Sequence, residues 1–137
     1  MESGANKRKK MVRREKITAL VVDDDITNRI IHRRLLQHLG IENQEVKNGK
    51  EAVDIHCPGT FFDLILMDMD MPIMNGIEAT KQLRAMGIRS TIVGVSTRSI
   101  QEQVQEFMEA GLDGYQEKPL TNAKLISILD KINHNGS

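Results

Sequence analysis

Residues 17–25 read ITALVVDDD, a short apolar run that ends abruptly in three aspartates. A compact aliphatic segment of this length predicts a buried β-strand, and the aspartates mark the point where the strand leaves the core. Residues 64–68, LILMD, repeat the arrangement with a single aspartate. Strands made almost wholly of β-branched and aliphatic residues are typical of parallel sheets that are covered on both faces.

Strand and helix patterns alternate along the rest of the chain. Further strands are predicted at residues 41–46, 91–95 and 114–117. Helices are predicted at residues 27–39, between Gly49 and Pro58, at residues 77–86, from Ser99 to Gly111 and at residues 122–132. In the first helix, Ile31, Leu35 and Leu39 are expected to face the core. Five strands alternating with five helices predict an α/β fold, a doubly wound (βα)5 domain with a five-stranded parallel sheet of flavodoxin-like type.

The 137-residue chain suits one domain, which we place at residues 16–133 between a basic tail (1–15) and a short C-terminal tail (134–137). Residues 1–16 hold seven Lys or Arg and two Glu, whereas the remainder holds 12 basic and 17 acidic residues. Because the basic tail lacks an apolar face to bury, we expect it to be disordered. Residues 7–10, KRKK, match a nuclear import signal or an anion-binding arm, but a solvated extension is the favoured interpretation.

Composition restricts the compartment and excludes some functions. No apolar run approaches the roughly 20 residues needed to span a bilayer, and the start lacks the apolar stretch of a signal peptide. The single Cys57 excludes an internal disulfide and suits a reducing compartment. We therefore expect a cytoplasmic protein without membrane contact, with the nucleus as an alternative. Aromatic residues make up 3% and Trp is absent, which argues against a platform for stacking bases.

Polar side chains follow four of the predicted strands. Asp23 and Asp24 follow the first strand, Asp68 the third, Ser96 the fourth and Lys118 the fifth. Because the carboxyl ends of parallel strands form one edge of the sheet, where ligands bind, we expect these side chains to converge. Several carboxylates in one pocket repel each other strongly unless a cation is present. Carboxylate oxygens, with phosphate oxygens and water, suit Mg²⁺, so the sequence predicts a magnesium site.

The same residues suit phosphoryl chemistry. Lys118 offers a positive charge and Ser96 a hydroxyl donor, and a phosphoryl group needs both as its charge spreads. Asp68 stands alone at the end of a central strand, and carboxylates form covalent phosphoryl intermediates, so it is the predicted acceptor. Taken singly, these residues fit simpler roles as helix caps, turn formers or surface lysines. Their joint placement at strand ends favours the site.

The chain resembles the receiver domain of two-component response regulators over residues 16–132. The resemblance rests on four ordered stretches, LVVDDD at 20–25, LMDMDMPIMNG at 66–76, VST at 95–97 and KP at 118–119. It implies that Asp24 and Asp68 bind Mg²⁺ directly and that Asp23 binds it largely through water. The main-chain carbonyl of Asp70 would complete the magnesium site.

The resemblance also implies how the site works. Asp68 would take a phosphoryl group from a phosphohistidine on a histidine kinase or a histidine-containing phosphotransfer protein. Ser96 would hydrogen-bond the group and Lys118 would pair with it, while Tyr115 would turn inward as part of a switch with Ser96. A cis peptide bond is expected between Lys118 and Pro119. The protein would be a signalling domain, with no enzymatic activity beyond its own phosphorylation and dephosphorylation.

Within that family, residues 62–68, FDLILMD, and 92–96, IVGVS, are similar to plant stand-alone response regulators, especially the small C-type group. Five residues follow Ile132, too few for a DNA-binding module, so we expect no direct DNA binding. The similarity implies phosphotransfer proteins as donors and a role as a phosphoryl sink in cytokinin-type signalling. We expect a monomer or a weak dimer.

Two weaker signals concern charged and titratable residues. Asp70 and Arg98 flank the predicted acceptor, and we hypothesise that they pair over Asp68 and slow hydrolysis of its phosphate. His32 and His38 lie six residues apart on the first predicted helix. Residues so spaced do not share a face well, so both histidines are expected to be solvated.

Two alternatives remain open from the sequence. In a phosphatase of the haloacid dehalogenase type, Asp68 would be the nucleophile and Asp70 the general acid of an Asp-Met-Asp motif. That family places its motif in the first strand and its acidic pair late, whereas here the pair Asp23 and Asp24 comes first. A non-catalytic interaction module would need a broken pocket, but the carboxylates and Lys118 are all present.

Overall fold

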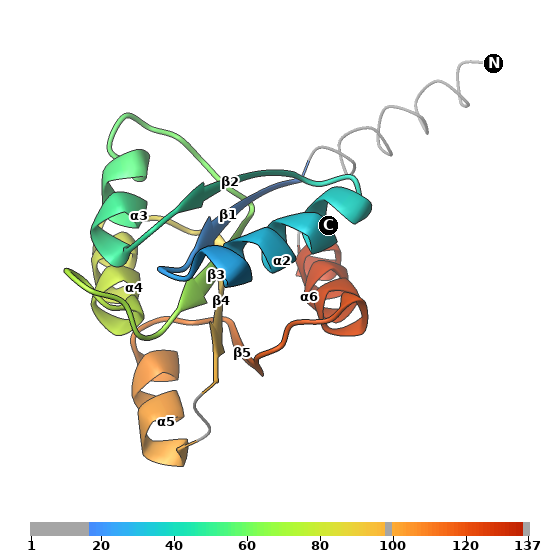
Figure 1. Ribbon diagram of the computed structural model, residues 1–137. Helices are drawn as coiled ribbons and strands as arrows, with labels where there is room; N and C mark the ends of the chain where they lie inside the picture. The colour runs from blue at the N-terminus through green and yellow to red at the C-terminus, as the bar shows by residue number, and fades with distance from the viewer. Residues whose placement is uncertain (1–16, 98–99, 136–137) are drawn as a thin grey trace.

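The computed structural model describes residues 17–97 and 100–135 (Figure 1). Its strands are β1 (Thr18–Val22), β2 (Glu42–Val46), β3 (Leu64–Asp68), β4 (Thr91–Ser96) and β5 (Gly114–Glu117). Its helices are α2 (Ile26–His38), α3 (Gly49–His56), α4 (Gly76–Ala85), α5 (Gln101–Glu109) and α6 (Asn122–Asn135). The strands pair in parallel in the order β2-β1-β3-β4-β5, which confirms the predicted doubly wound α/β class.

Helices cover both faces of this sheet. Successive residues of a strand point to opposite faces, so each central strand contributes to two cores. Val22 and Met67 pack on the side of α3, α4 and α5, whereas Val21 and Leu66 pack on the side of α2 and α6. Figure 1 shows these two groups of helices on opposite sides of the strands. Burial on both faces explains why β1 and β3 are continuous apolar runs.

The order of the strands reverses at β1. From β1 the chain passes to β2 on one side and then returns to β3 on the other side. Val22 pairs with Met67, so Asp23 and Asp68, the next residues along, emerge at the same level. Ligands bind at such a switch point in open α/β sheets. The fold therefore brings the predicted acidic residues to its standard binding position.

Helix α2 turns a different face to the sheet from the one predicted. Its buried residues are Arg29, His32 and Leu36. Ile31 is 40% exposed, and Leu35 and Leu39 pack only partly against the core, so the predicted apolar face is wrong in part. The expectation that His32 is solvated is also wrong, because its side chain is buried. The helix is rotated so that its inward polar groups lie toward Asp23 at the end of β1.

The loops around the sheet contain a helix cap, a residue with positive φ and a cis peptide bond. Asn75 begins α4 with a capping box, in which its side chain accepts from the Glu78 N–H and the Glu78 carboxylate accepts from the Asn75 N–H. In the preceding loop, Ile73 has a φ of 71°, which is strained for a β-branched residue. The predicted cis bond between Lys118 and Pro119 is confirmed.

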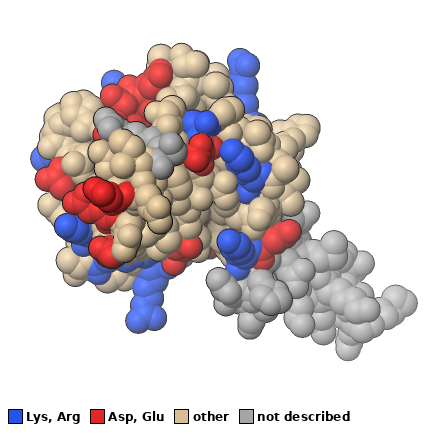
Figure 2. All heavy atoms as spheres, turned by 90° about the horizontal axis from the view of Figure 1, so that it is seen from below, with Lys and Arg blue, Asp and Glu red and all other residues tan. Residues whose placement is uncertain are grey.

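The surface mixes charges of both signs. On the face drawn in Figure 2, Lys and Arg side chains are interspersed with Asp and Glu side chains among the described residues. None of the helices in the described part of the chain is long and apolar enough to cross a membrane. The predicted basic tail and the hypothesised partner Arg98 lie outside the described residues.

Candidate functional site

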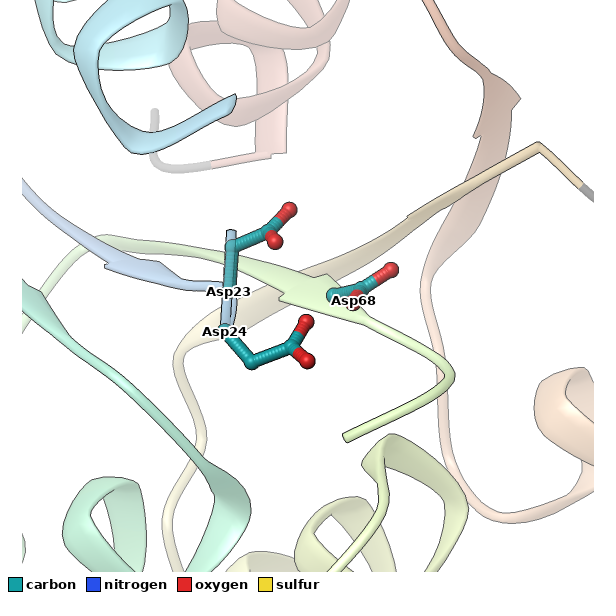
Figure 3. A group of neighbouring side chains, drawn as sticks. All are labelled: Asp23, Asp24 and Asp68. Atoms are coloured by element: carbon teal, nitrogen blue, oxygen red, sulfur yellow. The ribbon is translucent and has the colours of Figure 1, made fainter. Parts of the chain in front are cut away.

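Three carboxylates converge at the carboxyl ends of β1 and β3. Oxygen atoms of Asp23, Asp24 and Asp68 all lie within 4.8 Å of one another. Figure 3 shows the three side chains reaching into the same space, two from the end of β1 and one from the end of β3. Asp23 and Asp68 are buried, whereas Asp24 is exposed. The cluster is therefore anchored in the sheet and open to solvent on one side.

Lys118, which follows β5, lies between two of these carboxylates. Its Nζ donates to Oδ2 of Asp23 at 2.8 Å and to Oδ1 of Asp68 at 3.1 Å. Its main-chain N–H donates to the carbonyl of Ser96 at 2.9 Å, which ties the loop to the end of β4. Burial lowers the pKa of Lys118, but the hydrogen bonds and charges of the two carboxylates outweigh it and raise that pKa. Lys118 therefore stays charged within the site.

The carboxyl group of Asp68 has an unusual protonation equilibrium. Burial and the neighbouring charge of Asp23 raise its pKa from the ordinary value to about 7, although Lys118 opposes the shift. Within the described chain, Oδ1 of Asp68 accepts from Lys118, whereas Oδ2 has no hydrogen-bond partner. One oxygen of the predicted acceptor is thus oriented by a cation and the other is available.

Asp23 is held more completely than its neighbours. Its Oδ2 accepts from Lys118, and its Oδ1 accepts from the main-chain N–H of Asp25 at 2.9 Å. Asp25 in turn caps the first turn of α2 by accepting from the Thr27 N–H. With both oxygens of Asp23 engaged, Asp24 and Asp68 have more freedom to bind an ion directly.

Ser96 and Tyr115 lie on neighbouring strands beside this cluster. Ser96 is buried at the end of β4, and the register pairs its strand with that of Tyr115. Burial raises the pKa of the Tyr115 hydroxyl, and a hydrogen bond with the Ser96 side chain opposes that rise. The Tyr115 ring meets Phe107 edge to face, with 6.4 Å between ring centroids. The two predicted switch residues are therefore in contact with each other.

The loop after β3 passes close to the predicted acceptor. The N–H of Gly76 donates to the carbonyl of Met69 at 2.8 Å. A Cβ at Gly76 would lie 2.0 Å from the main-chain oxygen of Asp68, so only glycine fits there. Asp70 is exposed in this loop, and the role predicted for its carbonyl stays a prediction.

The sequence and the fold were compared with those of known proteins. Residues 19–130 match the family model of the response regulator receiver domain. The chain belongs to this family. The receiver is 64% identical to two-component response regulator 24 of Arabidopsis thaliana over 86% of this chain and 85% of the relative. It is 45% identical to two-component response regulator ARR22 of the same plant, covering 88% of this chain and 87% of the relative.

Solved structures give the same result for the fold. The receiver superposes on chemotaxis protein CheY4 of Vibrio cholerae with a TM-score of 0.77 and 29% identity, covering 85% of this chain and 98% of that one. The receiver domain of a sensor histidine kinase of Pseudomonas aeruginosa gives a TM-score of 0.78 and 30% identity, covering 86% and 98%. That domain has a magnesium ion coordinated in its active-site cleft. The receiver prediction is confirmed, and membership of this family argues against the phosphatase alternative.

The structure adds a residue that the sequence reasoning missed. Arg29 of the receiver is 6% exposed, and its Nη1 donates to the main-chain oxygen of Asp23 at 2.7 Å. His32, one turn further along α2, is also buried; burial lowers its pKa to about 4, although Asp23 opposes the shift. Arg29, His32 and Leu36 share one face of a helix at i, i+3 and i+7. That spacing alone does not show that this face is buried, because two of the three residues are polar.

Proposed function

We propose that this receiver accepts a phosphoryl group on Asp68 from a phosphohistidine donor in a magnesium-dependent phosphorelay. The observation that carries the proposal is the position of Asp68, which shares Lys118 with Asp23 inside a cluster of three carboxylates. A cation and an available carboxylate oxygen at one strand end are what an aspartyl-phosphate site requires.

The charges of the cluster fit a divalent cation. Three carboxylates and the Lys118 ammonium leave an excess of two negative charges when all are ionised. Burial raises the pKa of Asp68, and the negative charge of Asp23 raises it further. The donor atoms are all oxygens, which Mg²⁺ prefers. Asp24 and Asp68 would bind the ion directly, Asp23 through water and Asp70 through its carbonyl. Bound there, the ion would neutralise charge on the incoming phosphoryl oxygens.

The transfer itself needs few groups. An oxygen of the Asp68 carboxylate forms a bond to phosphorus as the bond from phosphorus to the donor imidazole nitrogen breaks, and the electron pair returns to that nitrogen. Lys118 then pairs with the phosphoryl oxygens instead of with Asp68. The Ser96 hydroxyl donates to the same group, and Tyr115 follows it inward as the switch.

Exposed isoleucines in the first part of α2 support a protein donor. Ile26 and Ile30 lie one turn apart on α2 and are 62% and 45% exposed, next to Asp25 at the start of the helix. Neighbouring exposed apolar side chains are candidates for a protein contact. The proposed donor is a histidine-containing phosphotransfer protein, as the resemblance to plant stand-alone response regulators implies, with a histidine kinase as the alternative. The proposed setting is cytokinin-type signalling in the cytoplasm or nucleus.

Chemical trapping of the aspartyl phosphate tests the acceptor. The protein is incubated with acetyl phosphate and Mg²⁺, reduced with borohydride, and digested for mass spectrometry. We expect the reduced residue at position 68, since an acyl phosphate is reduced whereas free carboxylates are not. Reduction at Asp23, Asp24 or Asp70 in place of Asp68 would contradict the assignment.

A further inference from the structure

Arg29 is a buried cation on a helix whose apolar residues are partly exposed. It is 6% exposed, whereas Ile30 and Ile31, the next residues of α2, are 45% and 40% exposed. Hydrophobicity alone would rotate α2 the other way, because burying a charge is costly unless it is fully paired. The orientation of α2 therefore depends on what the Arg29 guanidinium contacts.

The contacts of Arg29 join three parts of the fold. Its Nη1 donates to the main-chain oxygen of Asp23 at 2.7 Å, at the end of β1. Its Nε donates to Oε1 of Glu45 at 2.6 Å, on the edge strand β2. The other oxygen of Glu45 accepts from Arg33, one turn further along α2. Glu45 thus accepts hydrogen bonds from both arginines, and Arg29 is the one that also contacts the main chain of Asp23.

The oxygen that Arg29 holds belongs to the peptide between Asp23 and Asp24. Because a peptide unit is planar, fixing its carbonyl oxygen fixes the direction in which the next residue leaves. The N–H of Asp23 donates to the carbonyl of Val46 at 3.2 Å, so β2 also holds the other side of this residue. The two acidic side chains after β1 therefore project from a backbone held on both sides.

We propose that Arg29 is a positioning residue for the magnesium site: braced by Glu45, it fixes the Asp23–Asp24 peptide so that both carboxylates face Asp68. The inference rests on the proposed function, because it assumes that these carboxylates bind Mg²⁺. It assigns to Arg29 no contact with the ion or the phosphoryl group. Its effect comes through the main chain of Asp23, as outer groups orient metal ligands elsewhere.

The test measures Mg²⁺ affinity by calorimetric titration of the full chain, at a temperature where circular dichroism shows every variant folded. Arg29→Ala is expected to weaken Mg²⁺ binding about tenfold, the lower range for loss of an outer-shell partner. The Mg²⁺ affinity of Arg29→Lys should lie between those of the wild type and Arg29→Ala. An ammonium keeps the positive charge but lacks the two nitrogens that a guanidinium holds in fixed geometry. Arg33→Ala is the matched control, because Arg33 contacts Glu45 without touching Asp23; it should match the wild type.

The outcomes separate this inference from the proposed function. Wild-type protein that binds no Mg²⁺ would contradict the proposed function. If the wild type binds Mg²⁺ and a folded Arg29→Ala binds it equally well, the role of Arg29 is overturned while the proposed function stands. If Arg29→Ala does not fold, Glu45→Ala takes its place, because it removes the oxygen that accepts from Arg29 Nε. Mg²⁺ affinity equal to that of Arg33→Ala would then overturn the inference.

Discussion

The carboxyl group of Asp68 lies buried beside a second carboxylate, Asp23, and in contact with the ammonium of Lys118. Burial and Asp23 raise its pKa to about 7, so near neutral pH the acid exchanges its proton readily. A bound divalent cation would favour the ionised form, which is also the nucleophile. Proton and metal ion therefore compete at Asp68.

This raised pKa makes stability depend on pH. The folded protein keeps the Asp68 proton up to about pH 7, whereas the unfolded chain releases it near pH 4. Between these values the folded state binds more protons, so the contribution of Asp68 to stability falls as pH rises. Asp68→Asn, which never ionises, should gain on the order of 2 kcal/mol over the wild type at pH 8, or roughly 5 °C in Tm.

Thermal unfolding without Mg²⁺, followed at pH 5 and pH 8, checks this expectation. The gain of Asp68→Asn should be smaller at pH 5, where the wild-type carboxyl is still protonated. Asp130→Asn, at an exposed position on α6, is the control for a change of charge without burial. A gain that is larger at pH 5 than at pH 8 would show that the sign of the Asp68 shift is wrong.

At the scale of elements, one face of α2 packs against the sheet and the other face is exposed to solvent. Ile26 and Ile30 remain exposed in the first part of α2. If they contact the phosphoryl donor, Ile30→Glu should slow transfer from a protein donor about tenfold, as for an interface residue worth about 1.4 kcal/mol. Phosphorylation by acetyl phosphate should be unchanged, because a small donor needs no docking surface.

Phe61→Glu provides the matched control for that prediction. Phe61 is 60% exposed and precedes β3, so it lies at the opposite edge of the sheet from the acidic cluster. Phe61→Glu should slow phosphoryl transfer neither from the protein donor nor from acetyl phosphate. The docking role of α2 is excluded if Ile30→Glu and Phe61→Glu transfer at the same rate from a phosphotransfer protein.

The junction of β3 with α4 constrains the acceptor through its backbone. A Cβ at Gly76 would lie 2.0 Å from the main-chain oxygen of Asp68 and 3.0 Å from the Phe107 ring. Gly76→Ala should therefore displace Asp68, lower the free energy of unfolding by about 1–3 kcal/mol and slow phosphorylation by acetyl phosphate.

Denaturant unfolding and the phosphorylation rate measure the two effects of Gly76→Ala. Gly114→Ala is the control, because a Cβ there meets its nearest neighbour, Val93, at 4.0 Å. Equal stability and equal rates for the two variants would mean that the loop after β3 yields without moving Asp68.

The sequence predicted most of the fold because β1 and β3 are buried on both faces. Their uninterrupted apolar runs set the parallel sheet, and a parallel sheet brings the residues after its strands to one edge. Asp23, Asp24 and Asp68 could be placed together for that reason. Lys118 could be added because it follows the last strand.

The face of α2 could not be predicted in the same way. The sequence offers Ile31, Leu35 and Leu39 on one side and Arg29 with His32 on another, and apolar periodicity favours the first set. The outcome depends on partners distant in sequence, namely the main chain of Asp23 and the side chain of Glu45. Local patterns do not contain such contacts.

At the scale of the whole molecule, the carboxyl ends of the strands bring together the side chains that a single phosphoryl group would contact. Carboxylates come from β1 and β3, a hydroxyl from β4 and an ammonium from the segment after β5. Sites built on strands hold their groups more precisely than sites on loops, so these groups are positioned before any ligand arrives. Together these groups are expected to let Asp68 accept a phosphoryl group when Mg²⁺ is bound.

Transfer from a radiolabelled phosphohistidine protein measures this acceptor role, with wild type and Asp68→Asn compared in the presence of Mg²⁺ and of a chelator. We expect label to move to the wild type when Mg²⁺ is present, and none to move to Asp68→Asn or to either protein with the chelator. Transfer that survives Asp68→Asn would show that Asp68 is not the acceptor, and transfer that proceeds equally well without Mg²⁺ would show that the ion is not needed.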